Sequence, residues 1–197
     1  VWSDGRLKYL AVDIPVILTD DLGDLTELIE LKLDKAGLIA IPETIGNLKK
    51  LRILNITSNP LSSLPSGIKY LTKLEELIIS NNSLVTLPEN IGNLTQLLRL
   101  EADNNALVNI PESIGSLSSL NYLFLDHNQI EILPNTFSNL SHIIELRLQN
   151  NQLMGLPEGF GVFGELAHLY LNNNQLDALP ENFGIMSKLQ KLYLNNN

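Results

Sequence analysis

The chain has 197 residues, of which 44% are hydrophobic and 18% charged, a composition typical of a folded protein and not of a disordered one. It has no cysteine, which excludes disulfides, cysteine-ligated metals and thiol catalysis. Its net charge of −9 argues against a nucleic-acid partner, because a surface that follows phosphates needs clustered lysines and arginines.

The first part of the chain contains a turn signal and an irregular opening unit. An Asp-Gly step stands between apolar residues in residues 1–6 and predicts a hairpin. Leu7, Leu10 and Val12 then have the spacing of a strand, but Leu7 precedes the next unit by only 21 residues, so two residues are expected to be missing near a corner. We therefore assign residues 1–27 to an N-terminal hairpin and a degenerate first repeat.

From residue 28 onward the sequence repeats every 23 residues with the pattern LxxLxLxxNxLxxLPxxIxxLxx. Apolar residues at the fourth and sixth positions alternate with variable ones, which predicts one short strand in every unit. Seven full repeats occupy residues 28–188 and a partial eighth occupies residues 189–197. No polar cap covers the apolar residues of this last unit, so we expect the natural protein to continue.

The ninth position of each unit is asparagine, except in the first, where Ala36 stands. At this position a strand turns a corner and leaves backbone groups without partners. A buried amide can both donate to and accept from such groups, so these residues predict an internal hydrogen-bond ladder. The ladder asparagines are Asn59, Asn82, Asn105, Asn128, Asn151, Asn174 and Asn197.

A proline follows an apolar residue on the return path of every full unit. Proline fixes φ and supplies no N–H, so this limb suits the first turn of a short helix or 3₁₀ segment and not a central strand. The prolines are Pro42, Pro65, Pro88, Pro111, Pro134, Pro157 and Pro180.

The asparagine, the Leu-Pro step and the 23-residue period together resemble the leucine-rich-repeat family over about residues 7 to 197. The resemblance implies an α/β solenoid, a right-handed horseshoe with a concave parallel β-sheet and convex turns or 3₁₀ segments. In that family partners usually dock on the concave face. We therefore expect the outward strand residues to carry the function.

The outward third and fifth positions of the strands become rich in aromatic and arginine residues toward the carboxyl end. Polar residues are the default on a solvated sheet face, whereas Tyr, Phe and Arg are enriched at interface cores. The alternative, that the aromatic residues only pack against cross-strand neighbours, stays open. The predicted binding residues are Arg99, Tyr122, Phe124, Arg147, His168, Tyr170 and Tyr193. Ile53 and Ile78 form a smaller apolar spot.

No residue pattern predicts catalysis, a metal site or a cofactor. His127, His142 and His168 lie in three different phases of the repeat, so they indicate no ligand pair. A glutamate follows several of the prolines, where it favourably meets a helix dipole. No apolar run approaches the roughly 18 residues of a membrane span, so we expect no membrane insertion by this segment.

We interpret the chain as a non-enzymatic binding module that recognises another protein, with a secreted or cell-surface location favoured over a cytoplasmic one. Two alternatives remain. The aromatic residues could bind a carbohydrate, because rings stack on sugar faces and Glu145, Arg147, Asp126 and Gln149 could bond hydroxyls. The form LPxxIGxL also resembles intracellular signalling scaffolds.

Overall fold

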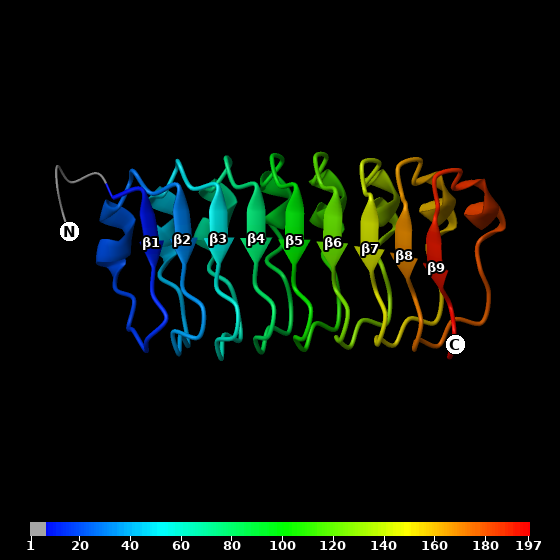
Figure 1. Ribbon diagram of the computed structural model, residues 1–197, viewed down its shortest axis with the longest axis horizontal. Coiled ribbons are helices and arrows are strands. Elements are labelled where there is room, and N and C mark those ends of the chain that lie inside the picture. The colour runs from blue at the N-terminus through cyan, green and yellow to red at the C-terminus, as the bar shows by residue number, and fades with distance from the viewer. Residues whose placement is uncertain (1–6) are drawn as a thin grey trace.

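The computed structural model describes residues 7–197, which form one solenoid (Figure 1). Within this range nine three-residue strands lie side by side in a single open sheet, all parallel and in chain order. The strands are β1 (Tyr9–Ala11), β2 (Glu30–Lys32), β3 (Ile53–Asn55), β4 (Glu76–Ile78), β5 (Arg99–Glu101), β6 (Tyr122–Phe124), β7 (Glu145–Arg147), β8 (His168–Tyr170) and β9 (Lys191–Tyr193). The predicted hairpin over residues 1–6 lies outside the described residues, and the boundary at residue 27 stays a prediction.

One short 3₁₀ helix lies on the return path between each strand and the next, because parallel neighbours need a crossover. Figure 1 shows these helices behind the sheet. They are η1 (Asp20–Asp24), η2 (Glu43–Asn47), η3 (Ser66–Tyr70), η4 (Ile91–Asn93), η5 (Glu112–Ser116), η6 (Asn135–Asn139), η7 (Glu158–Val162) and η8 (Glu181–Ile185). Within residues 7–197 no helix has the length and apolar content needed to cross a membrane.

The strand register follows the repeat length. Neighbouring strands from β2 to β9 pair residues 23 apart, so Leu54 lies beside Leu77 and Leu77 beside Leu100. The pair β1–β2 instead joins residues 21 apart, with Leu10 beside Leu31. The shorter opening unit therefore keeps its strand in register, and its missing residues fall in the connection.

The core lies between the sheet and the 3₁₀ side. The leucines at the centres of β2 to β8, and the leucine or isoleucine two residues before each of these strands, are at most 1% exposed. Each fully buried leucine contributes roughly 1.5–3 kcal/mol through the removal of apolar surface from water. Toward the carboxyl end phenylalanines replace aliphatic residues, and the rings of Phe160 and Phe163 meet edge to face with centroids 5.0 Å apart.

The corner asparagines join each unit to the one before it. The Asn128 side chain accepts a hydrogen bond from the amide of Leu107 (3.0 Å) and donates to the carbonyls of Ala102 (3.0 Å), Leu125 (2.9 Å) and Asp126 (3.2 Å). Most of these bonds recur at the equivalent positions of the neighbouring units. The amides therefore satisfy backbone groups that the short strands leave unpaired.

The residue before each corner position, Ala36 included, has a left-handed backbone, which the sequence pattern alone did not reveal. Asparagine tolerates positive φ better than most residues, and it stands at five of these eight positions. The eight residues have φ between 52° and 59° and are Lys35, Ser58, Asn81, Asn104, His127, Asn150, Asn173 and Asn196.

The first unit has Ala36 at the corner and closes differently. The amide of Val16 donates directly to the backbone carbonyl of Ala36 (3.0 Å). The turn also contains Pro15, which has no N–H to satisfy. A side-chain acceptor is therefore not needed at this corner, which explains why alanine is accommodated.

On the 3₁₀ side the prolines stand directly before the first helical residue in six of the helices, with Pro42 before η2 as an example. The carboxylate of Glu43 bonds across to the next unit, accepting from the amides of Ser66 (3.0 Å) and Gly67 (2.6 Å). Desolvation alone would raise the pKa of Glu43, but these hydrogen bonds outweigh it and hold the pKa below its ordinary value. This glutamate therefore links two units in addition to any effect on its own helix.

Candidate functional site

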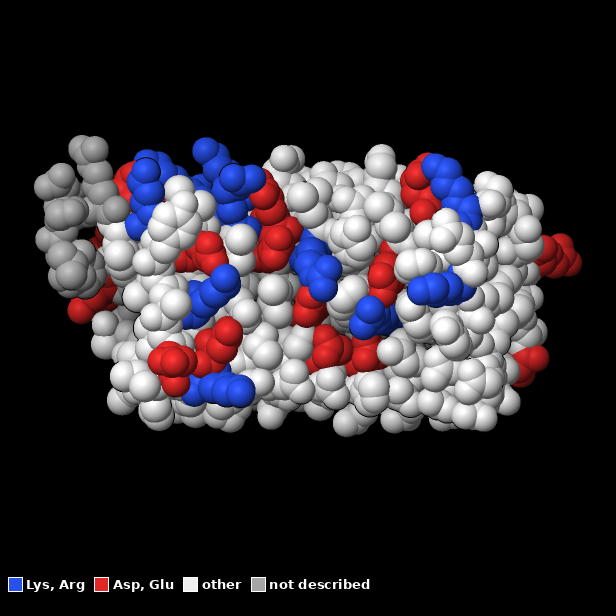
Figure 2. All heavy atoms as spheres, in the orientation of Figure 1, with Lys and Arg blue, Asp and Glu red and all other residues white. Residues whose placement is uncertain are grey.

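The outward face of the sheet, here called the sheet face, is the side that Figure 2 shows. Its third positions from β5 to β9 and its fifth positions from β6 to β9 form two rows of side chains. Strand pairing sets the fifth-position row as Phe124, Arg147, Tyr170 and Tyr193, in that order. The third-position row runs beside it and consists of Arg99, Tyr122, Glu145, His168 and Lys191. Both rows lie on one face because strand residues two apart point the same way.

The fifth-position row forms a continuous stack of rings and guanidinium groups. The Arg147 guanidinium lies over the Phe124 ring, 4.2 Å from its centroid, and 5.5 Å from the centroid of Tyr170. Tyr170 and Tyr193 are themselves stacked, with centroids 5.1 Å apart and planes 7° from parallel. Each side chain of the row therefore contacts the next.

The structure differs from the sequence interpretation at Phe124, which we expected to face solvent. Its side chain is only 6% exposed. The reason is that Arg99 covers one side of the ring at 4.8 Å from the centroid while Arg147 covers the other. Phe124 is thus the buried member of the row. The half-buried Tyr170 and the exposed Tyr193 are the members that a partner can contact.

Both arginines are paired with carboxylates on their own strands. Arg147 bonds to Glu145 with 2.6 Å between Nη2 and Oε1, and Arg99 pairs in the same way with Glu101. Opposite charges two residues apart lie next to each other on one side of a strand, which makes such pairs possible. The arginines therefore add little net positive charge to the face.

The remaining predicted residues attach to the same network. The guanidinium of Arg99 lies 5.5 Å from the Tyr122 ring centroid. His168 places Nδ1 3.6 Å from Oε2 of Glu145, the carboxylate that also holds Arg147. The structure thus brings all seven predicted residues into one contiguous cluster.

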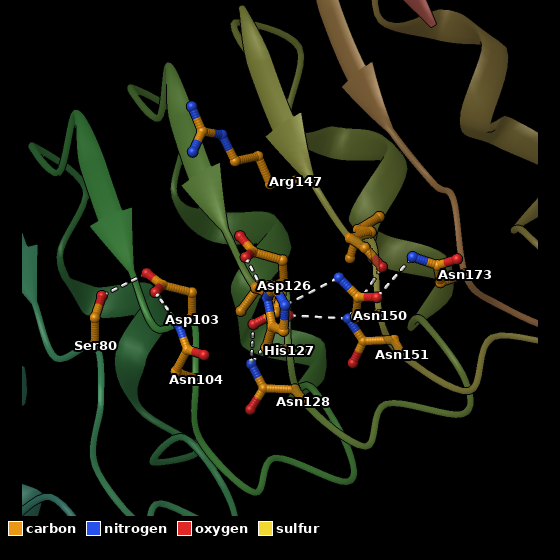
Figure 3. Close-up of polar contacts among 12 residues, drawn as sticks. Ser80, Asp103, Asn104, Asp126, His127, Asn128, Arg147, Asn150, Asn151 and Asn173 are labelled. Atoms are coloured by element: carbon orange, nitrogen blue, oxygen red, sulfur yellow. Dashed lines mark hydrogen bonds and ion pairs between the residues drawn. The ribbon is translucent and has the colours of Figure 1, made fainter. Parts of the chain in front are cut away.

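A belt of polar side chains follows the carboxyl ends of β4 to β8 (Figure 3). Asp103 accepts hydrogen bonds from Ser80 and from Asn104, and His127 Nδ1 lies 2.8 Å from Oδ2 of Asp126. This polar belt consists of Ser80, Asp103, Asn104, Asp126, His127, Asn150 and Asn173.

The contacts of the belt agree with one tautomer of His127. Nδ2 of Asn150 lies 3.1 Å from Nε2 of His127, and Nδ2 of Asn173 donates to Oδ1 of Asn150 at 2.8 Å (Figure 3). With Asn150 donating, the neutral imidazole accepts at Nε2 and carries its hydrogen on Nδ1, which donates to Asp126. The hydrogen bonds consequently run in one direction from Asn173 to Asp126.

The two rows form a surface for contact, and a hollow of about 270 Å³ lies further along the sheet, at Lys32 and Asp34 beside β1 and β2. Hollows of about 560 and 640 Å³ lie on the 3₁₀ side, and both are lined in part by Glu158. Neither is lined by a residue of the two rows. Among residues 7–197 no three His, Asp or Glu side chains are placed to hold a metal ion.

Comparison with known proteins agrees with this architecture. One family model, described as a leucine-rich repeat region, matches residues 12–106, and a second, described as a leucine rich repeat, matches residues 99–153. The chain is a leucine-rich-repeat protein. No curated protein matches it.

Solved structures of leucine-rich-repeat proteins have the same fold. An internalin, InlF, from Listeria monocytogenes is 27% identical with a TM-score of 0.80, over 95% of this chain and 54% of that one. The plant peptide hormone receptor RGFR1, solved in complex with RGF2, is 27% identical with a TM-score of 0.81, over 93% of this chain and 32% of that one. A leucine-rich-repeat protein from Leptospira interrogans is 29% identical with a TM-score of 0.58, over 91% of this chain and 63% of that one. The chain therefore spans less than two thirds of the length of each of these proteins.

The sequence interpretation omitted Asp103 and the ion pairs within strands. The pairs had a visible signal, because opposite charges occupy the third and fifth positions of β2, β5 and β7. The sequence signal at Asp103 was weaker, because the seventh position of the repeat, which Asp103 occupies, varies among Asp, Thr, Ser, Gln and Asn. That Asp103 and the paired charges lie beside the aromatic row is seen only once the strands are placed next to one another in the structure.

Proposed function

We propose that the chain is a non-enzymatic module that binds another protein through the sheet face of β5 to β9. The observation that carries this proposal is the continuous stack of Phe124, Arg147, Tyr170 and Tyr193. Aromatic and arginine side chains dominate interface hot spots because they bury a large area. The solved complex of the plant hormone receptor with RGF2 also supports a protein or peptide partner.

Preorganisation of the row supports the same proposal. Binding normally costs about 0.5–1.5 kcal/mol for each flexible side chain that becomes fixed at an interface. Arg147 is already held by Glu145 and by two rings, and Tyr170 is held between Arg147 and Tyr193. The contacts within the row therefore lower the entropy that these side chains lose when a partner binds.

The ring geometry favours protein over the carbohydrate alternative. A sugar stacks on a free ring face, but the faces of Phe124 are covered by two guanidiniums, and those of Tyr170 by Arg147 and Tyr193. Apart from one face of Tyr193, which among the described residues stacks only against Tyr170, the row offers ring edges and tyrosine hydroxyl groups. These suit backbone carbonyls and polar side chains of a protein, since ring edges are electropositive.

A secreted or cell-surface location belongs to the same proposal. Its support is the structural likeness to an internalin and to a plant hormone receptor. An intracellular scaffold is the competing proposal, and no contact within residues 7–197 favours it.

Site-specific photocrosslinking tests the proposed surface. A benzophenone amino acid replaces Tyr193 on the sheet face in one variant and Glu112 on the 3₁₀ side in a matched control, since both residues are exposed. We expect illumination in an extract of the source cells to link a protein to position 193 and not to position 112. Crosslinking from position 112 alone would contradict the proposal.

A further inference from the structure

The charge on the central part of the sheet face is negative. Across β4 to β7 and the turn that follows each strand, the outward positions hold two arginines against five carboxylates, those of Glu76, Glu101, Asp103, Asp126 and Glu145. Both arginines are occupied by carboxylates of their own strands. The unbalanced charge therefore belongs to the acidic side chains, and Figure 2 shows red side chains among the blue ones on this face.

Asp126 differs from an ordinary solvated carboxylate. The residue is only 8% exposed, yet the protein gives it no lysine or arginine partner among residues 7–197. Its Oδ2 accepts from His127, while its Oδ1 accepts no hydrogen bond from the described chain. Because a carboxylate in a poorly hydrated position attracts a cation more strongly than one in water, this oxygen is a strong acceptor for a donor supplied from outside.

Asp103 and Asp126 lie in neighbouring units of the solenoid. They occupy the same position in consecutive units, and neighbouring strands lie about 4.8 Å apart. Ser80 and Asn104 orient the carboxylate of Asp103, as His127 orients that of Asp126 (Figure 3). A basic side chain that lies over these two neighbouring units therefore faces both carboxylates.

The two carboxylates lie beside the aromatic row. Asp126 is two residues from Phe124 along the chain and points to the same face of the sheet. A bound segment that contacts Tyr170 and Tyr193 and follows the row toward β5 passes beside this acidic pair.

We propose that the partner presents a basic segment, whose lysine or arginine side chain docks between Asp103 and Asp126 while adjacent residues contact the rings of Tyr170 and Tyr193. This inference rests on the proposed function and specifies its partner. The negative face attracts a basic segment and repels an acidic one, and the net charge of −9 acts in the same direction. Tyr170 and Tyr193 provide the contact area, and the carboxylates provide the charge selectivity.

Selection from a random 12-residue peptide library displayed on phage tests both proposals at once. The library is selected on the immobilised protein and counter-selected on a Tyr170→Ala/Tyr193→Ala variant, so that only peptides that need the row are kept. Enriched peptides are then synthesised, and their affinities are measured by fluorescence anisotropy. The acidic pair is tested with Asp103→Asn/Asp126→Asn, which suits the fold because asparagine occupies the same position at Asn172 and Asn195.

A second double variant, Glu89→Gln/Glu112→Gln on the 3₁₀ side, controls for the loss of two negative charges. We expect row-dependent peptides to be rich in lysine and arginine, and Asp103→Asn/Asp126→Asn to weaken them at least about tenfold. The control should change affinity less than about twofold, and added salt should weaken binding to the unmodified protein.

The outcomes separate the two proposals. Row-dependent peptides that are acidic or neutral, or that bind the Asp103→Asn/Asp126→Asn variant as tightly as the unmodified protein, overturn the basic-segment inference and leave the sheet-face proposal standing. A selection that yields no row-dependent peptide counts against the sheet-face proposal itself and removes the inference with it.

Discussion

Replacing Asn128 by alanine probes the corner hydrogen bonds in the middle of the solenoid. The change removes one acceptor and one amino group, and their four partners are not affected equally. The carbonyl of Ala102 keeps a bond from Asn105 (3.1 Å), and that of Leu125 keeps one from Asn151 (3.0 Å). The carbonyl of Asp126 also keeps a backbone partner.

Only the amide of Leu107 loses its sole acceptor, and this residue is 0% exposed. A buried donor without a partner costs about 1–3 kcal/mol, and each weakened carbonyl adds a smaller amount, so we expect Asn128→Ala to lower the free energy of unfolding by about 2–3 kcal/mol. Urea denaturation followed by circular dichroism measures it. Asn139→Ala is the matched control, because Asn139 is exposed and its side chain makes no hydrogen bond within residues 7–197. A loss below about 0.5 kcal/mol for Asn128→Ala would show that the corner asparagines do not hold the units together.

Three further changes test other parts of the structure. Phe124→Ala should lower the free energy of unfolding by about 2 kcal/mol in urea denaturation, because the ring is 6% exposed between two guanidiniums; a loss below about 0.5 kcal/mol would contradict this burial. Glu43→Gln should destabilise the protein slightly at pH 7 and less at pH 3. The pKa of Glu43 is lower in the folded protein than in the unfolded chain. The ionised carboxylate therefore stabilises the fold above the ordinary carboxyl pKa, and this stabilisation disappears as the pH falls through the folded-state pKa. A difference between the two proteins that grows on acidification would refute this linkage. Gly161→Ala should lower the melting temperature because its Cβ would lie 2.0 Å from the carbonyl oxygen of Asn182, whereas Gly164→Ala, whose Cβ meets nothing within 4 Å, should leave it unchanged or raise it slightly; equal effects would be the contrary result.

Much of the fold could be predicted because the same constraints recur every 23 residues. The parallel sheet, its chain-order pairing and the short helices after the prolines all follow from positions where Leu, Asn and Pro are repeated. The left-handed residue before each corner was harder to predict, since Lys35, Ser58 and His127 take it as well as asparagine. Because Lys, Ser, His and Asn all occur at this position, no one residue type in the sequence indicates the left-handed backbone.

The candidate site could be predicted only as a set of neighbours. Strand alternation and the repeat length are enough to place Tyr122, Phe124, Arg147 and Tyr170 on one face. Burial was not predictable, because the cover over Phe124 depends on the rotamers of two arginines on adjacent strands. Those rotamers depend in turn on the ion pairs with Glu101 and Glu145, so the burial of Phe124 depends on four neighbouring side chains at once.

The central claim, that the sheet face binds a protein partner, is tested most directly by the affinity of the protein identified by crosslinking at position 193. Isothermal titration calorimetry compares the unmodified chain with Tyr170→Ala on the sheet face and Glu112→Ala on the 3₁₀ side, each checked for an unchanged melting temperature. Truncating a central hot-spot aromatic costs at least about 2 kcal/mol, so Tyr170→Ala should weaken binding by about 30-fold or more. Glu112→Ala should leave the affinity unchanged. If Glu112→Ala abolishes binding while Tyr170→Ala preserves it, the partner binds the opposite side of the solenoid and the claim is wrong.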